Sequence, residues 1–510
     1  MMSTLKLGWA RREISTNEPV SVPGQMYIRV SKGIMDPLYV TALCVDGGEG
    51  QDKVVFLSCD IVTVWQAVLE DLQALLAKER PDIPWETVVL NVTHTHTSIA
   101  LTATPEKTPD GVSIYPGEKS RAFFCRQAVD AIAEAWDSRA EGGIAYGYGY
   151  AVVAHSRRTV YFKEERLAQL AEKPRDFMTP AGYAVMYGKT DDPYFSHYEA
   201  GADHFLNLMF TFDKNEKLTG IIVNVPCPSQ VGGGLSVLTS DYWAEVRQLV
   251  AEEYGEDVFV LPQCAAAGDL SPRPLHYRKA QARRLSLKYG KPYDLSQVKV
   301  GTEYELIHIK AQRMDIAEQI LLGIKDVYSW ARKDIRTDVP VRHKLTTMAL
   351  ERRRMTDEEE AWCKENLELL KDMEPKPEDY TPEEYRVKYS RYQSMVGRNT
   401  RGLQRCEDVK QNPTLDMDSH TIQIGDVAFA TIRFELFQDF MHRLQARSPF
   451  QQTFVVQLAG AAGGNYLATK RAAEAKGYSA SMFCNMVSAD GGQQWVENTL
   501  EILNDMKEEE

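Results

Sequence analysis

Two histidines separated by one residue are the first feature of the sequence that could do chemistry. His94 and His96 stand in the segment VVLNVTHTHTS at residues 88–98. Residues two apart on a β-strand project from the same face, so a strand that continues through both histidines would present them together. Paired imidazoles suit metal binding or proton transfer. The competing interpretation is two hydrogen-bonded, half-buried histidines, but polar groups gathered at a strand end favour a functional site.

Other side chains with chemical potential also stand where apolar segments end. Ligand crevices of α/β proteins form outside the carboxyl ends of their strands, so such side chains are candidates for one shared site. In chain order they are His94, His96, Arg157, Cys227, Ser271, Glu435 and Tyr466.

The elements that must position these residues alternate between strands and helices. Buried strands are predicted over residues 53–62, 88–92, 143–158 and 426–437, and two more within 204–230. Helices are predicted over residues 65–78, 118–139, 241–254, 303–333 and 493–506, with Asp241 as the N-cap of the third. The sequence therefore predicts an α/β fold: a mixed β-sheet core flanked by helices.

One region differs in character from the rest. Residues 351–411 are dense in mixed charge and contain several prolines, but no heptad pattern persists through them. We expect residues 1–350 and 412–510 to form one catalytic domain, and residues 351–411 to be a charged helical insertion.

Composition limits the function classes. The 510-residue chain has a net charge of -13, which argues against a nucleic-acid partner. We find no apolar leader segment and no apolar stretch long enough to insert into a membrane. Its eight cysteines include no CxxC pair, as expected for reduced thiols in a cytoplasmic protein. The sequence leaves open whether the chain forms a homo-oligomer.

Taken in order, the motifs resemble the amidase domain of the neutral/alkaline, non-lysosomal ceramidase family. THTHTS resembles the family's THTHSG, SRRT at residues 156–159 stands where the family has NRSP, and QCAAAGDLSPR resembles its GD-x-SP loop. RFELF resembles the family's glutamate-bearing turn, and Tyr466 and Tyr478 match two family tyrosines at the same spacing. The resemblance spans nearly the whole chain, apart from residues 351–411. The C-terminal immunoglobulin-like domain of family ceramidases is not expected here.

The resemblance implies a zinc-dependent amidohydrolase that cleaves a linear C–N amide bond, with ester hydrolysis open to the same machinery. It implies Zn²⁺ as the cofactor, with His94, Glu435 and Tyr466 among its ligands. It also implies that His96, Arg157 and Tyr478 polarise the carbonyl group and hold the oxyanion. Ser271 occupies the position of the family's active-site serine.

Cys227 departs from the family pattern. It stands fourteen residues before Asp241 and directly before Pro228, where the family has its second zinc histidine. Three interpretations stay open. Cys227 is a thiolate zinc ligand, which we favour; or it pairs with His94 or His96 as the nucleophile of a metal-free, Cys-dependent hydrolase or transferase; or it is a small core residue in a non-catalytic ligand-binding protein that keeps the fold. The substitution leaves the occupancy of the metal site open.

The predicted substrate is a small, polar, water-soluble amide, not ceramide. The loop over residues 104–116, expected to frame the site, is rich in Thr, Pro, Asp and Gly. Arg157 and Arg158, if both reach the cleft, would suit a carboxylate or phosphate group on the substrate.

Overall fold

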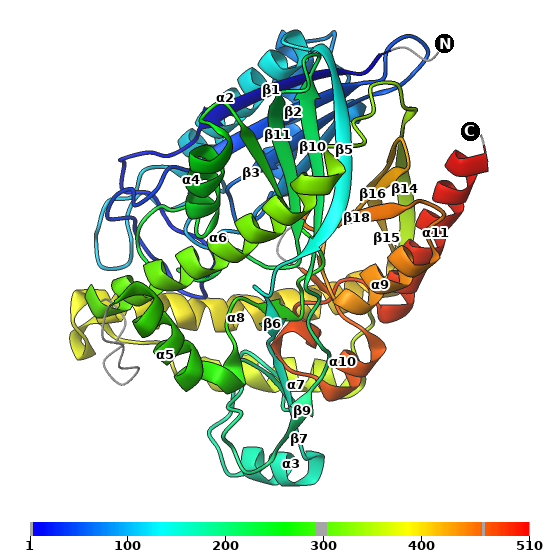
Figure 1. Cartoon of the computed structure of the whole chain (residues 1–510). Helices are drawn as coiled ribbons and strands as arrows, with labels where there is room; N and C mark the ends of the chain where they lie inside the picture. The colour runs from blue at the N-terminus through cyan, green and yellow to red at the C-terminus, as the bar shows by residue number, and fades with distance from the viewer. Residues whose placement is uncertain (1–3, 291–302, 462–464, 509–510) are drawn as a thin grey trace.

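An eight-stranded mixed sheet forms the centre of the computed structural model, which describes residues 4–290, 303–461 and 465–508 (Figure 1). Its strand order is β12-β11-β10-β5-β1-β2-β3-β4. The strands are β1 (Lys6–Glu13), β2 (Tyr39–Asp46), β3 (Lys53–Cys59), β4 (Val88–Val92), β5 (Ala140–Tyr150), β10 (Phe205–Asp213), β11 (Leu218–Val225) and β12 (Phe259–Cys264). Although β4 and β12 end the hydrogen-bonded order, they contact each other, so the sheet is curled.

A second, four-stranded sheet packs into the concave side of the first. It contains β14 (Val341–Glu351), β15 (Thr414–Ile424), β16 (Val427–Thr431) and β18 (Gln452–Val456). Phe429 stacks on Phe454 at 4.5 Å between ring centroids and meets Phe56 of β3 at 4.9 Å. Alternate residues of both sheets therefore share one dry core, as period-2 strands predict.

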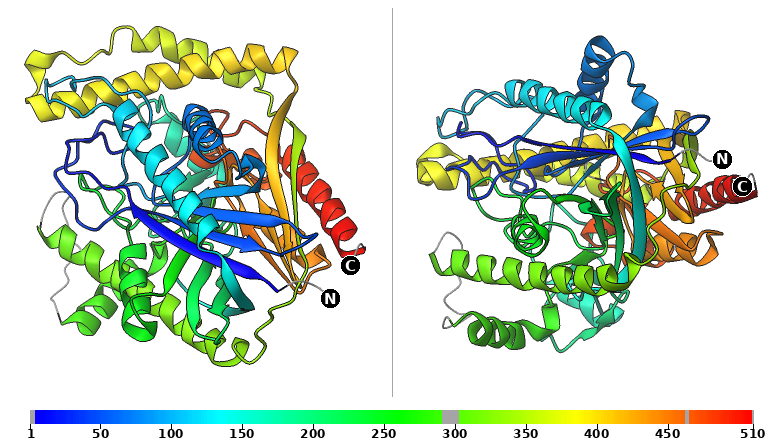
Figure 2. Two further views of the ribbon diagram at one scale, coloured as in Figure 1. Left: turned by 90° about the horizontal axis from the view of Figure 1, so that it is seen from above. Right: turned by 45° about the horizontal axis from the view of Figure 1, so that its top comes forward.

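Helices cover the outer faces of both sheets (Figure 2). Helices α1 (Gln66–Glu79) and α2 (Gly117–Asp137) pack on β1–β4. Helices α4 (Trp243–Tyr254) and α6 (Glu303–Ala331) pack on β5 and β10–β12. Helices α9 (Gln438–Arg447) and α11 (Ala489–Glu508) pack on the four-stranded sheet. The predicted fold class, a mixed β-sheet core flanked by helices, is confirmed.

Residues 351–411 contain two helices between β14 and β15. These are α7 (Asp357–Leu370) and α8 (Pro382–Gln411), and both begin at a threonine capping box. The long α8 crosses the molecule (Figure 1) and is tied to the loops before α2 by an ion pair between Arg386 and Asp110 at 2.9 Å. Its mixed charge thus includes buried contacts as well as a solvated face. The division into a catalytic domain and an insertion stays a prediction.

Short elements build the remaining side of the molecule. They are β6 (His155–Ser156), β7 (Arg158–Tyr161), α3 (Lys163–Ala171), β8 (Ala184–Met186), β9 (Phe195–Tyr198), β13 (Leu270–Ser271), α5 (Arg278–Tyr289), β17 (Glu435–Leu436), β19 (Tyr466–Leu467) and α10 (Lys470–Ala475). Figure 1 shows three of them, α3, β7 and β9, at the bottom. No helix within the described ranges is long and apolar enough to cross a membrane.

Two local predictions are wrong. Strand β4 ends at Val92, and His94 takes a left-handed backbone with φ of 60°, so strand alternation does not continue to His96. Asp241 does not cap α4, whose N-cap is Tyr242. Asp241 is itself left-handed, with φ of 56°, and its carboxylate accepts from the backbone N–H groups of Gly232 and Tyr242. In both cases a polar residue in a left-handed turn stands beside the regular element and not within it.

Candidate functional site

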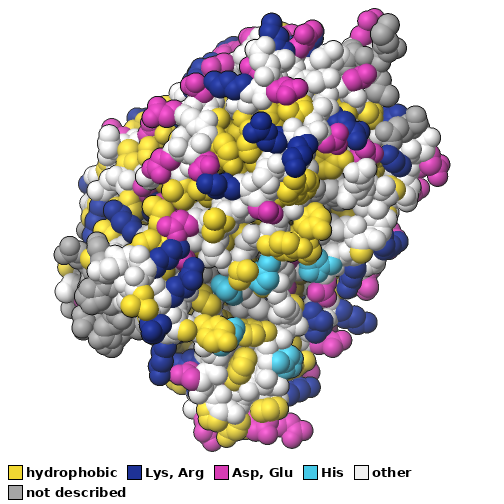
Figure 3. Space-filling model, viewed as in Figure 1, with side chains coloured by type: hydrophobic (Ala, Val, Ile, Leu, Met, Phe, Trp, Pro, Cys, Tyr) yellow, Lys and Arg dark blue, Asp and Glu magenta, His cyan; other side chains and the backbone are white. Residues whose placement is uncertain are grey.

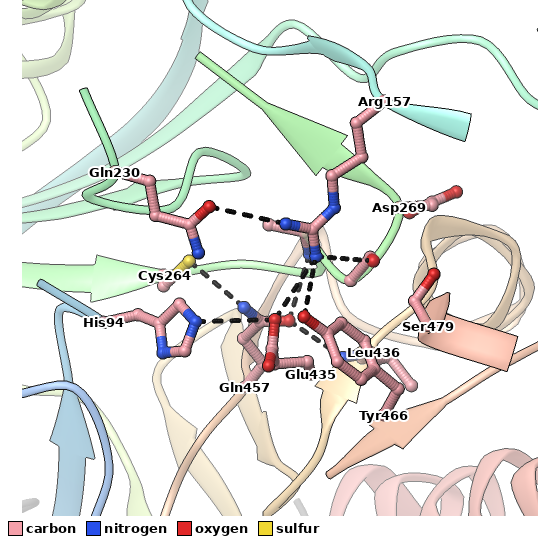
Figure 4. Close-up of polar contacts among 12 residues, drawn as sticks. His94, Arg157, Gln230, Cys264, Asp269, Glu435, Leu436, Gln457, Tyr466 and Ser479 are labelled. Carbon is pink, nitrogen blue, oxygen red and sulfur yellow. Dashed lines mark hydrogen bonds and ion pairs between the residues drawn. The ribbon is translucent and has the colours of Figure 1, made fainter. Parts of the chain in front are cut away.

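The chain segments that carry the predicted site residues meet beside one end of the curled sheet. The loop after β4 supplies His94 and His96, and the residue between β6 and β7 is Arg157. Strands β17 and β19 pair in parallel with Glu435 opposite Tyr466, which brings a carboxylate and a phenol from distant sequence together. Figure 4 shows Glu435 with His94 on one side and Arg157 and Tyr466 on the other.

His94 points its Nε2 into this cluster. Its Nδ1 lies 2.7 Å from the carbonyl oxygen of Val62, which can only accept, so Nδ1 carries the proton. In the neutral ring, Nε2 is then a bare lone pair, 3.4 Å from Oε2 of Glu435. A histidine held through Nδ1–H by a backbone carbonyl is the usual arrangement of a metal ligand.

His96 presents an unprotonated nitrogen to the same cluster. Its Nε2 lies 3.2 Å from Nε2 of His94 and 2.9 Å from the side-chain nitrogen of Gln230. The Gln230 oxygen already accepts from Arg157 and from the Tyr187 hydroxyl, so its nitrogen must donate to His96. Burial, together with the charges of neighbouring groups, His94 first among them, lowers the pKa of His96 well below its ordinary value. The ring is therefore neutral at pH 7.

Gly24 is required for this position of the His96 ring. A Cβ atom on residue 24 would lie 2.7 Å from the imidazole, and the backbone φ of +95° there favours glycine. A side chain at residue 24 would push His96 away from the cluster.

Arg157 joins the parts of the site. It is 1 % exposed, and its Nη2 donates to the Gly268 carbonyl at 2.8 Å and to Glu435 and Tyr466 at 3.3 Å each. Burial alone would raise the pKa of Glu435, but His94 and Arg157 outweigh it, and the pKa is lowered. The carboxylate is therefore ionised at pH 7 and can pair with a cation beside it.

The two tyrosines lie together as the resemblance implies. Their rings are 6.2 Å apart and edge-to-face. Burial, with Glu435 adding to it, raises the pKa of Tyr466 well above its ordinary value, and burial likewise raises the pKa of Tyr478. Arg398 of α8 lies 4.7 Å from the centre of the Tyr478 ring, so the insertion reaches this site.

Ser271 contacts the cluster only through a neighbour. Its side chain is fully buried, accepts from the backbone N–H of Arg273 at 3.2 Å and hydrogen-bonds to Tyr187. Tyr187 in turn accepts from Arg157 at 3.3 Å. Ser271 thus positions the tyrosine behind the arginine.

Cys227 is not brought together with the other predicted ligands. Strand β11 ends two residues before it, as the flanking prolines predict, but its Sγ lies 3.4 Å from the carbonyl oxygen of Val153 in an apolar cluster. Burial raises the pKa of this thiol well above its ordinary value. Among the residues that the structure describes, Cys227 belongs to no group of three His, Cys, Asp or Glu ligand atoms within 4.8 Å. In this position Cys227 packs as a small core residue, which is the third interpretation of the sequence; its assignment as a thiolate ligand, which the sequence favoured, stays a prediction.

His94 is the donor that links the others. Its Nε2 lies 3.2 Å from Nε2 of His96 and 3.4 Å from Oε2 of Glu435, but among the described residues these three ligand atoms do not all lie within 4.8 Å of one another. Imidazole and carboxylate at such distances can share a proton or bind a metal ion. Tyr466 adjoins His94 and Glu435 through the β17–β19 pairing. Their assignment as zinc ligands stays a prediction.

A separate group also has metal-ligand spacing. Glu360, Cys406 and Glu407, on α7 and α8, place their ligand atoms within 4.8 Å of one another. Lys364 and Lys410 pair with its carboxylates at 2.6 Å each, so the negative charge there is already balanced. A metal ion at this group would have to replace both lysines in their ion pairs with Glu360 and Glu407.

Arg158 does not reach the cleft, contrary to the arrangement considered from the sequence. It is buried and donates two hydrogen bonds, of 2.7 and 2.8 Å, to the carboxylate of Glu199. The sequence did not indicate Gln230 or Tyr187 as site residues. The signal for Gln230 is that it follows Cys227 by three residues. Tyr187 is marked by a left-handed backbone, with φ of 60°, which the sequence does not reveal.

A cavity of about 710 Å³ opens over the cluster. His96, Arg157, Tyr466 and Tyr478 contribute to its lining, so the cluster forms part of a space large enough for a small molecule. Most of the rest of the wall comes from the loop at residues 24–27, the segment after Gln230, and the start of α5 with the neighbouring part of α6.

Comparison with known proteins places this site in a recognised fold. No protein-family model matches the chain, and no curated protein sequence matches it. The crystal structure of neutral ceramidase from Pseudomonas aeruginosa matches with a TM-score of 0.64 and 15% sequence identity, over 99% of this chain and 75% of that one. A structure titled ceramidase complexed with C2 matches with a TM-score of 0.63 and 14% identity, over 99% of this chain and 76% of that one. The predicted resemblance is confirmed at the level of the fold: the chain has a neutral-ceramidase-like structure.

Proposed function

We propose that the protein is a metal-dependent hydrolase of a C–N amide bond in a small polar substrate. The observation that carries the proposal is the cluster of His94, His96 and the ionised Glu435, next to the buried cation Arg157, with His96 and Tyr466 in the wall of a cavity. Imidazole and carboxylate donors suit a metal ion, and a catalytic metal needs a neighbouring space for water and substrate. The neutral-ceramidase-like fold supports amide cleavage as the reaction.

The proposed ligands are His94, Glu435 and Tyr466, and zinc is the proposed ion. A bound zinc ion supplies Lewis acidity toward a carbonyl oxygen and toward water. Tyr466 would have to give up its proton to ligate. Burial and Glu435 raise its pKa and oppose this, so the bound ion, with the charge of Arg157, would have to stabilise the phenolate. Cys227 has no part in this assignment.

Arg157 would stabilise the oxyanion that forms from the amide carbonyl. It is buried and fixed by several acceptors before substrate arrives, so it does not need to reorganise during the reaction. Tyr478, which lines the same cavity, would donate a second hydrogen bond to that oxygen.

His96 would accept a proton from the water that attacks the amide carbonyl and deliver it to the leaving amine. It is neutral at pH 7 because burial lowers its pKa, and its Nε2 lone pair is held in the cavity wall by Gln230. Transfer of that proton to nitrogen allows the C–N bond to break.

The test combines metal analysis with a substrate screen. The purified protein is expected to contain about one zinc ion per chain, to release amines from short acylated amines, amino acids or amino sugars, and to act more slowly on long-chain ceramide in detergent. Thiol alkylation is expected to leave the activity intact. Faster turnover of ceramide than of every soluble amide would contradict the substrate class, and a metal-free protein without amidase activity would instead be a ligand-binding protein with this fold.

A further inference from the structure

The cavity above the site is positively charged in a protein that is acidic overall. The chain has a net charge of -13, yet the residues that line the cavity include Arg157, Arg273 and Arg278. None of the described lining residues is an aspartate or a glutamate. Figure 3 shows Lys and Arg side chains gathered over α5, which contributes Arg278. A cavity with this lining favours an anionic occupant.

The arginines differ in whether their charge is already balanced. Arg157 is paired with Glu435 at 3.3 Å, and Arg158 outside the cavity is paired with Glu199 at 2.7 Å. Arg273 and Arg278 are exposed, and no described carboxylate forms an ion pair with either. Their charges are therefore free to meet a ligand.

Arg273 is also held in a fixed place relative to the site. Pro272 and Pro274 flank it and restrict the backbone on both sides. Gln312 donates to the Pro272 carbonyl at 2.8 Å, and the Arg273 N–H bonds to Ser271 at 3.2 Å. The loop is thus fixed to both α6 and the short strand β13.

The charge of Arg273 acts on groups in the cavity. Its guanidinium carbon is 5.9 Å from the centre of the Tyr187 ring. Burial would raise the pKa of Tyr187, but Arg157 and then Arg273 outweigh it, so the pKa is lowered. Burial, followed by the charge of Arg273, also lowers the pKa of His308 of α6 to about 4, and His308 lines the same cavity. Arg273 therefore lies close to Tyr187, which bonds to Arg157, and within electrostatic reach of His308.

We propose that the substrate carries a carboxylate or phosphate group close to the scissile amide, and that Arg273, assisted by Arg278, binds this anion. The planar guanidinium fork matches both groups through two parallel hydrogen bonds. The inference rests on the proposed amidase function and narrows it to anionic amides. Arg273 is a specificity residue in this proposal, while Arg157 acts on the amide itself.

The first arm of the test compares matched amides on the wild-type protein by acetate release. N-acetylalanine is compared with N-acetylalaninamide, and N-acetylethanolamine phosphate with N-acetylethanolamine. We expect kcat/KM to be at least about 10-fold higher for the anionic member of one pair, the size of one or two hydrogen bonds to a charged group. The pair with the larger ratio identifies carboxylate or phosphate. Equal rates within both pairs would overturn the inference while leaving the amidase function standing.

The second arm uses variants of the arginines. Arg273→Gln is expected to raise KM for the preferred anion about 10-fold or more and to leave the neutral amide within about twofold. Arg273→Lys should recover part of the loss, because it keeps the charge but not the fork. Arg283→Gln, on the exposed part of α5 outside the cavity, is the matched control and should change neither rate. Equal loss on both amides in Arg273→Gln would overturn the inference.

A direct binding measurement separates this inference from the proposed function. If no amide is hydrolysed, the amidase function fails, and calorimetry with N-acetylalanine and with N-acetylethanolamine phosphate decides the anion site alone. Binding of either probe that weakens about 10-fold in Arg273→Gln and not in Arg283→Gln supports it. Binding of neither probe to the wild-type protein overturns it.

Discussion

Two pairs of histidines face each other among the described residues, and they differ in whether a proton can be shared between the facing ring nitrogens. In the site, Nε2 of His94 and Nε2 of His96 are 3.2 Å apart and the rings are nearly perpendicular, at 85°. In the four-stranded sheet, Nε2 of His343 and Nδ1 of His420 are 2.8 Å apart and the rings are stacked, at 17°.

The count of protons distinguishes the two pairs. For His343 and His420, one ring can donate and the other accept, so two neutral imidazoles satisfy each other. For His94 and His96 in their neutral forms, the Val62 carbonyl takes the one proton of His94 on Nδ1 and the Gln230 amide donates to Nε2 of His96, so no proton lies between the two Nε2 atoms. This pair is completed by a cation, either a further proton or a metal ion, whereas the other pair needs none. Four predictions test this difference.

The largest effect is expected for the metal. His94→Gln should lower zinc affinity by more than about 100-fold, because it removes a ligand and not merely a supporting hydrogen bond. His420→Gln, the equivalent change in the other pair, should leave zinc content unchanged. Metal content by mass spectrometry of the native protein measures both. Equal zinc content in all three proteins would contradict the cation site at His94.

The next effect is on turnover. Arg157→Lys should lower kcat by about 10²–10³-fold, the cost of removing one preorganised oxyanion donor, with a smaller change in KM. Zinc content should stay that of the wild type, since Arg157 is not a proposed ligand. Arg283→Lys on the surface of α5 is the control. A large rise in KM with kcat unchanged would show instead that Arg157 only binds substrate.

The sequence predicted the site residues that belong to short motifs, and it did not predict those that only the folded backbone brings into the site. The His-x-His spacing, the two tyrosines and the strand before Glu435 are visible as motifs, and the structure brings His94, Glu435 and Tyr466 together. The way His94 enters the site was not visible, because a left-handed turn replaces the strand expected there.

Long-range pairings account for most of the rest. His343 and His420 meet only through the register of β14 and β15, which pairs Leu345 with His420. Gln230 and Tyr187 become site residues through Arg157, a contact that no spacing reveals. The sequence could likewise identify Cys227 as standing at the family's histidine position, but it could not show that the sulfur turns toward an apolar cluster.

A third, smaller effect concerns the stability of the folded protein in acid, which depends on His343 and His420 of the four-stranded sheet. Burial lowers the pKa of His343 to about 4 and the pKa of His420, with His343 adding to the effect, to about 3, from an ordinary value of 6.5. Between pH 6.5 and about 4 the unfolded chain therefore binds more protons than the folded one. The stability from keeping this pair neutral is complete above pH 6.5 and is lost as pH falls toward 4.

The corresponding measurement is urea unfolding at pH 7.5 and pH 5. Between these two pH values the free energy of unfolding should fall by about 1–2 kcal/mol less in His420→Gln than in the wild type, because the variant lacks one histidine whose pKa is lowered by folding. His197→Gln, at an exposed position, should leave the loss unchanged. An unchanged loss in His420→Gln would contradict the neutral-pair assignment.

The smallest effect is expected at Cys227, where the sequence and the structure differ most. The thiol lies in an apolar cluster, hydrogen-bonded to the Val153 carbonyl. Cys227→Ala should therefore cost only about 1 kcal/mol of unfolding free energy, as for the loss of one small buried group. Zinc content and kcat/KM should stay within about twofold of the wild type. Cys59→Ala, at an equally buried free cysteine under α1 and α2, should cost a similar amount and serves as the matched control. Loss of zinc in Cys227→Ala, with zinc retained in Cys59→Ala, would restore Cys227 as a ligand and require its side chain to turn toward His94 and Glu435.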